Sequence, residues 1–225
     1  MTLETELTQK IRGKLNRVRV IDAALQLMDE QGLEAVTMRA VARDLGVEAM
    51  SLYNHVHDKE DLMDGVIERV MEGFRRPEPR EEWLEAARDA GREWRRLLKA
   101  HPPMIQLLAE HSKPMTTTAT LECMECALSP MLRAGLTPRE AADAFQTFGG
   151  YIFGFVLMET RGTFSGPESG DITPESLNAI VPDIDRLPNV AAVFPEMCAT
   201  DPDAQFEFGL DLLLAGLQAK VAGRG

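Results

Sequence analysis

The chain has 225 residues, of which 44% are hydrophobic, so it can bury a sizeable core and is not a disordered polypeptide. Its formal net charge is −12, and an acidic surface repels nucleic acid. Any binding of nucleic acid must therefore come from a local basic patch. Residues 10–19, KIRGKLNRVR, form such a patch, because they include basic side chains and no acidic one.

Neither secretion nor insertion into a membrane is indicated. The first residues, MTLETELTQK, are polar and acidic and lack the apolar core of a secretory signal. The apolar stretch 144–158 is about 15 residues long, whereas a helix needs about 20 to span a bilayer. Three cysteines are too few for a disulfide framework. We therefore expect a cytoplasmic protein with no membrane partner.

Helical periodicity runs through nearly the whole chain, so we predict an all-α fold. The predicted N-terminal helices cover about 17–31, 37–45 and 48–54, and a fourth begins after Asp58. Thr37 and Asp58 can cap the free N–H groups of the helices that follow them. Gly32 and Gly46 can end the preceding helices because glycine readily adopts a positive φ. The apolar stripe of the fourth helix comprises Leu62, Val66, Ile67, Val70 and Phe74.

The segment AVARDLGVEAMSLYNHVHDKEDL, residues 40–62, has the parts of a helix-turn-helix. Ala42 is small enough to lie where two helices cross, and Gly46 provides the turn. Val47 and Leu52 are expected to fill the core beneath that turn. This arrangement leaves Ala49, Met50, Ser51 and Asn54 on the outer face of a helix of a size that fits a DNA major groove.

Residues beside that outer face suit contact with phosphate groups. Tyr53 and His55 offer ring donors. Lys59 lies in the first turn of a helix, where the macrodipole disfavours a cation unless a phosphate is bound there. Arg39 can reach a guanine edge or a phosphate. Taken singly, residues such as Tyr53 and His55 are more often ordinary surface or packing residues than DNA contacts.

Two prolines in the charged stretch RRPEPREE, 75–82, predict a break between two domains, and a continuous helix is the alternative. Further helices are predicted at about 81–100, 103–111, 115–134, 138–161 and 203–221. Residues 163–190 are rich in Gly, Pro, Ser and Asp and are expected to form a long surface loop with at most one short helix.

Residues 14–74 strongly resemble the N-terminal domain of the TetR (tetracycline repressor) family, with LGV at 45–47, L-Y-x-H at 52–55 and K-x-x-L at 59–62. The resemblance implies a homodimer that binds near-palindromic double-stranded operator DNA. It places a DNA-binding domain at 14–74 and a ligand-binding and dimerisation domain at 81–221. The implied DNA contacts are Thr37, Arg39, Ala49, Met50, Ser51, Tyr53, Asn54, His55 and Lys59. A basic arm of Lys10, Arg12, Lys14, Arg17 and Arg19 could add phosphate contacts, or could be a solvated tail.

The C-terminal part resembles the same family more loosely. Two apolar segments, AFQTFGGYIFGFVLMETRG and QFEFGLDLLLAGLQAKV, would by analogy form a four-helix dimer interface of about 1,500 Å² or more. Gly150 and Gly154, four residues apart, would allow the helices to approach closely. Plain intrachain core is the alternative interpretation.

An effector cavity is expected between the central helices of the C-terminal part. The candidate lining residues are His101, Met104, Leu107, Leu108, Met124, Phe148, Tyr151 and Phe155, with His111 and Gln106 as further polar contacts. Side chains at helical spacing also fit ordinary core. The residues that bind tetracycline in the type member are not visible here, so neither tetracycline nor its magnesium ion is predicted. The pair Cys123 and Cys126 lacks the further ligands of a zinc site, and no cofactor is expected.

The sequence therefore predicts a ligand-responsive transcriptional regulator, a homodimeric repressor that an unidentified small apolar effector releases from its operator. No catalytic motif of the hydrolase, metalloprotease or nucleotide-binding type occurs, so an enzyme is not expected. Two alternatives remain: an activator of the same family, or a small-molecule-binding or catalytic helical protein with a vestigial DNA-binding domain.

Overall fold

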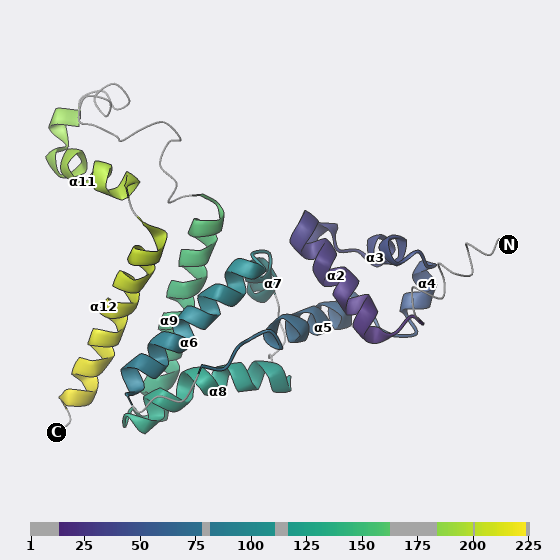
Figure 1. Cartoon of the computed structure of the whole chain (residues 1–225), viewed down its shortest axis with the longest axis horizontal. Coiled ribbons are helices and arrows are strands. Elements are labelled where there is room, and N and C mark those ends of the chain that lie inside the picture. Colours follow the sequence, from purple (N-terminus) through teal and green to yellow (C-terminus); the bar gives the residue numbers. More distant parts are fainter. Residues whose placement is uncertain (1–13, 78–81, 111–116, 163–183, 200, 224–225) are drawn as a thin grey trace. The chain divides into compact units, whose positions relative to one another are not determined.

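The computed structural model describes residues 14–77, 82–110, 117–162, 184–199 and 201–223. Every regular element in these ranges is a helix, which confirms the predicted all-α fold (Figure 1). Among the described helices, none is both long and apolar enough to cross a bilayer. The chain forms two compact units, which are described separately.

The first unit holds the described residues up to Phe74 and those between Pro103 and Leu121. Its elements are α2 (Arg17–Gln31), η1 (Leu33–Ala35), α3 (Met38–Leu45), α4 (Ala49–Leu52), α5 (Lys59–Met71) and α7 (Met104–Glu110). α2 packs against both α3 and α5, and α7 packs against α5 and η1. The buried side chains of α5 include Leu62, Val66, Ile67 and Val70, as the predicted stripe requires.

Short polar side chains begin the helices of the first unit. Asn16, Thr37 and Asp58 each accept a hydrogen bond from a backbone N–H three residues further on, at the starts of α2, α3 and α5. Gly32 and Gly46 follow the ends of α2 and α3, and both have positive φ angles. These caps satisfy backbone groups that helix ends leave without intrahelical partners. They explain why the helix boundaries here follow the local sequence.

The second unit is built on α6 (Trp83–Ala100), α9 (Pro138–Thr160) and α12 (Pro202–Ala222), which pack pairwise against one another. α8 (Thr118–Arg133) begins in the first unit and continues in the second. Two glycines permit the close packing. A Cβ on Gly91 would lie 3.3 Å from Leu210 of α12, and a Cβ on Gly209 would overlap the ring of Tyr151.

The predicted helices differ from the observed ones at two places and agree at the expected interruption after α5. α4 ends at Leu52 and not at residue 54, and the helix α11 (Pro188–Cys198), which packs on η2 (Ile184–Arg186), was not predicted. Residues 72–77 are not helical, so α5 and α6 do not form one continuous helix, as the sequence predicted. Most of the predicted loop 163–190 lies outside the described residues.

Candidate nucleic-acid interface and effector region

The turn of the helix-turn-helix is fixed by the backbone of Gly46. Gly46 lies in the left-handed region, at φ 68° and ψ 36°. The N–H of Val47 donates to the carbonyl of Ala42 over 2.9 Å, and the N–H of Gly46 donates to the carbonyl of Arg43 over 3.2 Å. A side chain at position 46 would be strained, because residues other than glycine rarely adopt this conformation.

α4 has one buried and one outward side. Leu52 is fully buried and Ala42 of α3 is 2% exposed, whereas Met50 is 75% exposed. Ala49 and Ser51 are half-buried, and Asn54 is exposed just beyond the helix. The predicted orientation of Leu52 and Met50 is therefore confirmed, although Val47 is only half-buried and does not belong to the innermost core.

The predicted phosphate-contacting residues lie on both sides of α4 in the sequence. Thr37 and Arg39 are exposed at the start of α3, and the Thr37 hydroxyl oxygen accepts a hydrogen bond from the N–H of Ala40 over 3.1 Å. Tyr53 is 46% exposed. Lys59 is exposed and is the first residue of α5, so its charge lies at the positive end of that helix dipole.

Arg17 differs from its predicted place in a basic arm. Its guanidinium donates two hydrogen bonds to the carboxylate of Asp61, over 2.7 and 2.9 Å, and a third to the carbonyl of His55 over 3.1 Å. The hydrogen bonds from Arg17 are the main cause that lowers the pKa of Asp61 to about 2. Lys14 is exposed and Arg19 is half-buried, while Lys10 and Arg12 lie outside the described residues.

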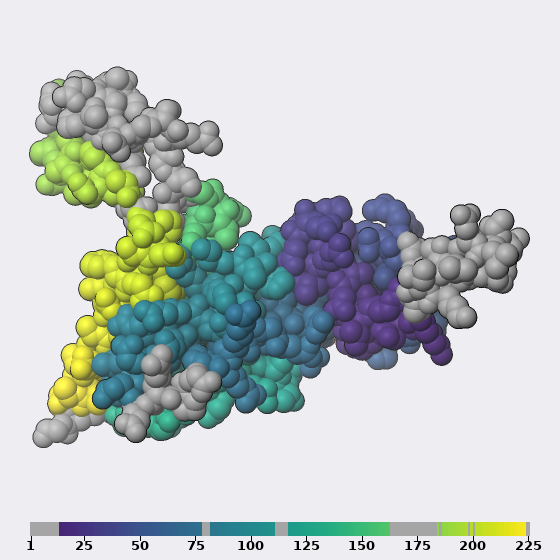
Figure 2. Space-filling model, in the orientation of Figure 1, coloured from purple at the N-terminus to yellow at the C-terminus, as the bar shows by residue number. Residues whose placement is uncertain are grey.

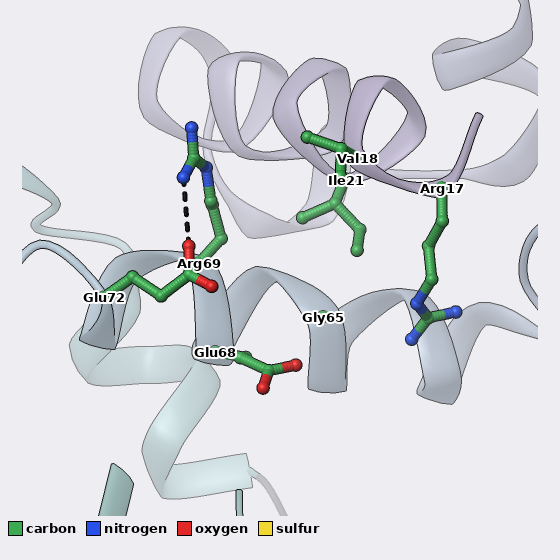
Figure 3. Close-up of a pocket in the computed structure, with 7 residues that line it drawn as sticks. All are labelled: Arg17, Val18, Ile21, Gly65, Glu68, Arg69 and Glu72. Atoms are coloured by element: carbon green, nitrogen blue, oxygen red, sulfur yellow. Dashed lines mark hydrogen bonds and ion pairs between the residues drawn. The ribbon is translucent and has the colours of Figure 1, made fainter. Parts of the chain in front are cut away.

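Sequence reasoning missed the pair of Arg17 and Asp61. The two residues are 44 positions apart, and both belong to residue types that occupy ordinary surface sites. Only the packing of α2 on α5 brings them together. The same two helices enclose a surface cavity of about 250 Å³, lined by Arg17, Val18, Ile21, Gly65, Glu68, Arg69 and Glu72 (Figure 3).

The predicted effector residues divide between the two units. Met104 and Leu107 are buried in α7 of the first unit, with Leu108 half-buried beside them. His101 follows the end of α6. Met124 of α8 is half-buried, and Phe148 of α9 is 7% exposed.

Tyr151 and Phe155 of α9 take part in an aromatic cluster with Phe206 of α12. Tyr151 stacks on Phe206 with ring centroids 5.6 Å apart, and its hydroxyl donates to the Phe206 carbonyl over 2.9 Å. The Phe155 ring meets Phe206 edge to face at 5.2 Å. The guanidinium of Arg95 lies 4.7 Å from the Phe206 centroid and 5.4 Å from the Phe155 centroid. These contacts join α6, α9 and α12 within one unit.

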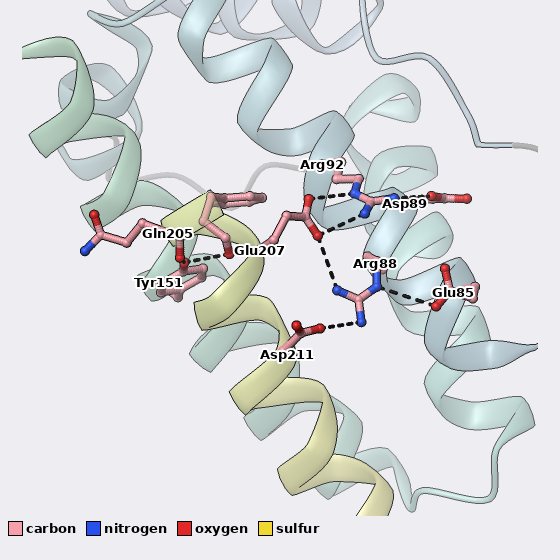
Figure 4. A network of polar contacts seen from close by, with 9 residues as sticks. Glu85, Arg88, Asp89, Arg92, Tyr151, Gln205, Glu207 and Asp211 are labelled. Atoms are coloured by element: carbon pink, nitrogen blue, oxygen red, sulfur yellow. Dashed lines mark hydrogen bonds and ion pairs between the residues drawn. The ribbon is translucent and has the colours of Figure 1, made fainter. Parts of the chain in front are cut away.

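Buried and half-buried ion pairs reinforce the same three helices. Arg95 holds both carboxylate oxygens of Glu159, over 2.6 and 3.0 Å. Burial opposes ionisation of Glu159, but the hydrogen bonds from Arg95 and Lys99 outweigh it and lower its pKa. A second network in Figure 4 joins Arg88 and Arg92 of α6 to Glu207 and Asp211 of α12.

α9 and α12 also expose apolar side chains. We call this set the α9/α12 apolar surface, and it consists of Leu157 (38% exposed), Met158 (44%), Phe208 (64%) and Leu212 (61%). Gly150 and Gly154 on α9 would each leave an added Cβ in open space. Figure 2 shows the atoms of α12 (yellow) at the surface of the second unit. α11 is similarly exposed at Val193 (52%) and Met197 (63%).

The two cysteines whose side chains the structure describes lie in α8. Cys123 is buried, and burial is the main cause that raises the pKa of its thiol to about 11. Burial also raises the pKa of Cys126, which is half-buried. Among the described side chains, no group of three or more His, Cys, Asp or Glu residues is placed to hold a metal ion.

Two family models match the chain. "Bacterial regulatory proteins, tetR family" matches residues 20–66, and "Tetracyclin repressor-like, C-terminal domain" matches residues 76–221. The chain is 31% identical over 214 residues to the HTH-type transcriptional repressor DrrR1 of Streptomyces coeruleorubidus, covering 92% of this chain and 78% of that protein. It is 28% identical to the class A tetracycline repressor protein from transposon 1721 of Escherichia coli, covering 91% of each.

A solved structure extends the similarity to three dimensions. The TetR family protein ActR of Streptomyces coelicolor, in complex with actinorhodin, superposes with a TM-score of 0.76 at 25% identity, covering 93% of this chain and 99% of that one. The C-terminal model alone spans more than half of the chain. From the helix-turn-helix at its N-terminus and the matched C-terminal domain, we conclude that the chain belongs to the TetR family of transcriptional regulators.

Proposed function

We propose that this chain is a homodimeric repressor that binds near-palindromic operator DNA and is released from it by a small apolar effector. The observation that carries the proposal is the exposed outer side of α4, where Met50 is 75% exposed directly above the buried Leu52. A short helix that is anchored from beneath and open on its outer side fits the major groove.

The residues of this outer side divide into base readers and phosphate contacts. Ala49 and Met50 would touch thymine methyl groups, and Ser51 and Arg39 would supply polar contacts to base edges. Asn54 can serve either purpose. Contacts to the DNA backbone fall to Thr37, Tyr53, His55 and Lys59, which fix the position of the helix without reading sequence.

Homodimerisation would place two copies of α4 on one duplex. The α9/α12 apolar surface supports this proposal, because four large apolar side chains are more than a third exposed on two neighbouring helices. Burial of such a surface against a second copy would remove it from water. The open space at Gly150 and Gly154 would let a partner helix approach α9 closely.

Effector binding would occur in the second unit. ActR, which is 25% identical to this chain, has been solved with actinorhodin. Among the predicted lining residues, Phe148 and Met124 lie in this unit, as do Tyr151 and Phe155 of the aromatic cluster. An effector would act by binding more tightly to a conformation that fits DNA poorly. The effector is proposed only as a small, largely apolar molecule.

Repression, and not activation, is proposed because several relatives that this chain matches over most of their length are named repressors. These are DrrR1 and the tetracycline repressor proteins. The same membership supports a regulator without catalytic activity that works in the cytoplasm, where its DNA target lies.

Selection from a random-sequence duplex library tests the proposal. The unsubstituted protein should enrich a near-palindromic sequence and bind it at physiological salt. The double variant Tyr53→Ala/Lys59→Ala should lose affinity for this duplex and for unrelated duplexes alike, because it removes contacts to the DNA backbone. Equal binding by the double variant would refute these roles, and failure of the unsubstituted protein to enrich any duplex would refute the proposed function.

A further inference from the structure

The turn that joins α4 to α5 carries several of the proposed phosphate contacts. Its own backbone supplies two hydrogen bonds, from the N–H groups of His55 and Val56 to the carbonyl of Leu52. Two more come from charged side chains outside the turn. Arg17 donates to the carbonyl of His55 over 3.1 Å, and the N–H of His57 donates to Asp61 Oδ2 over 2.7 Å.

Arg17 and Asp61 connect these two outer hydrogen bonds. The guanidinium of Arg17 meets the carboxylate of Asp61 through Nη1 and Nη2, over 2.9 and 2.7 Å. Parallel bonds of this kind fix the relative orientation of the two groups as well as their distance. The hydrogen bonds from Arg17 are also the main cause that lowers the pKa of Asp61 to about 2, so the pair favours the ionised carboxylate. The start of α2 is thereby joined to both ends of the segment 55–57.

We propose that Arg17 is a positioning residue for DNA binding, which acts through Asp61 and the His55 carbonyl to hold the turn 53–59 in its binding conformation. This inference rests on the proposed function of the helix-turn-helix. It assigns Arg17 a role different from that of a basic arm, because its guanidinium is bound to protein acceptors and does not reach for phosphate.

The affinity for DNA depends on the fraction of molecules in which the turn 53–59 has its binding conformation. We call the contacts of Arg17 with Asp61 and the His55 carbonyl, together with that of Asp61 with the His57 N–H, the clamp. If the clamp is lost, Tyr53, His55 and Lys59 are correctly placed for a smaller fraction of the time. The apparent dissociation constant rises as that fraction falls. Loss of charge-assisted hydrogen bonds of this kind should weaken binding roughly tenfold.

Arg69 offers a matched control on the same pair of helices. It extends from α5 to α2, and its Nε donates to Asp22 Oδ1 over 2.8 Å. Its side chain is 45% exposed, close to the 42% of Arg17. Figure 3 shows the two arginines at opposite ends of the cavity between α2 and α5. Arg69→Gln therefore removes an interhelical arginine–aspartate pair without touching the turn.

The experiment measures binding of the full chain to the duplex that the unsubstituted protein selects from a random library. Arg17→Gln and Asp61→Asn should each weaken binding roughly tenfold, and the double variant should be no weaker than the worse single variant, since both remove one clamp. Arg69→Gln should bind as the unsubstituted protein does. Fluorescence anisotropy with a labelled duplex provides the affinities, and thermal unfolding checks that all variants are folded at the temperature used.

The sign of the Asp61→Asn effect separates positioning from direct phosphate contact. If Arg17 bound phosphate, removal of the competing carboxylate would free it and would also remove a negative charge near DNA, so affinity would rise. A rise, or an unchanged affinity for Arg17→Gln, overturns the proposal. A failure to select any duplex overturns the proposed function, and this inference falls with it.

Amide hydrogen exchange gives a second result that does not depend on DNA. The N–H of His57 should exchange faster in Arg17→Gln and Asp61→Asn than in the unsubstituted protein, because its acceptor is Asp61 Oδ2. In Arg69→Gln the rate at His57 should be unchanged. Equal acceleration at His57 and throughout α5 in all three variants would indicate a general loss of stability and would contradict a specific clamp.

Discussion

α4 and α12 both have apolar side chains on opposite sides, but on different scales. In α4, a single methionine is exposed above a single buried leucine, at positions 50 and 52. In α12, Leu210 and Leu214 are buried, while Phe208 and Leu212 are 64% and 61% exposed. An isolated exposed residue on a short helix fits a contact with base edges in a DNA major groove. Large apolar side chains exposed on successive turns of a long helix fit a contact with another helix surface.

The two helices also differ in what their neighbours contribute. α4 follows the turn at Gly46, and the segment after it is contacted by the charged side chains of Arg17 and Asp61. α12 is held against α6 by ion pairs along one side, such as Arg92 with Glu207 (Figure 4). One side of α12 is thus satisfied within the chain, whereas Phe208 and Leu212 remain exposed on another side.

The largest expected effect is at the α9/α12 apolar surface. Leu212→Glu places a charge where the proposal buries an apolar side chain, and an unpaired buried charge costs several kcal/mol. The dimer should therefore weaken by at least about 100-fold, with little change in the fold of the monomer because Leu212 is exposed there. Sedimentation velocity over a concentration series measures this.

Leu132→Glu on α8 is the control for that prediction, since Leu132 is 45% exposed and lies outside the α9/α12 apolar surface. It should leave the association unchanged. Equal association of Leu212→Glu and the unsubstituted protein would place the dimer interface elsewhere.

The next effect concerns the stability of the first unit. Leu52→Ala should lower the free energy of unfolding by about 2–5 kcal/mol, because it leaves a cavity beneath the turn. Met50→Ala, two residues earlier, should change it by less than about 0.5 kcal/mol, because Met50 is exposed. Chemical denaturation followed by circular dichroism compares the two. Similar losses for both variants would mean that Met50 is packed inside the folded protein.

Gly154→Ala should change the stability of the monomer and the affinity of the dimer in opposite directions. A Cβ at this position meets no atom within 4 Å of its own chain, so α9 should gain roughly 0.5–1 kcal/mol from the better helix former. The dimer should become weaker, since the methyl group would hold the partner helix away. Thermal unfolding at low and high protein concentration distinguishes the two effects. A stronger dimer would show that Gly154 does not face the partner.

The smallest expected effect is electrostatic. The hydrogen bond from Arg92 is the main cause that lowers the pKa of Glu207 in the folded chain. A carboxyl group with a lowered folded pKa stabilises the fold above its unfolded pKa, and that contribution is lost as pH falls through the folded value. Between about pH 6 and about pH 3, Glu207→Gln should therefore lose less stability than the unsubstituted protein, by at most about 1 kcal/mol. An identical pH dependence in calorimetry would contradict this assignment.

Local signals in the sequence predicted most of the first unit. Thr37, Gly46 and Asp58 define helix ends through their own side chains or backbone, so the positions of α3 and α5 could be predicted without knowledge of the tertiary fold. The inward side of α4 could be predicted because Leu52 is the large apolar residue expected to fill the core. The pair of Arg17 and Asp61 could not be predicted, because it depends on the register of α2 against α5.

The second unit was less predictable because apolar residues occur on both sides of its helices. Core and interface positions in α12 have the same residue types, and burial alone separates Leu210 from Leu212. α11 was not predicted, and it contains an internal proline, Pro195, a residue that argues against a helix. Met104 and Leu107, predicted to line a cavity of the C-terminal domain, are buried in α7 of the first unit.

The most direct test changes only the outer side of α4. Met50→Arg and the unsubstituted protein are each used to select duplexes from the same random library. The variant should select guanine at one or two positions in each half-site and keep the half-site spacing, because arginine pairs with the guanine edge. Selection of the same sequence by both proteins would show that Met50 does not face the bases and would contradict the proposed DNA interface.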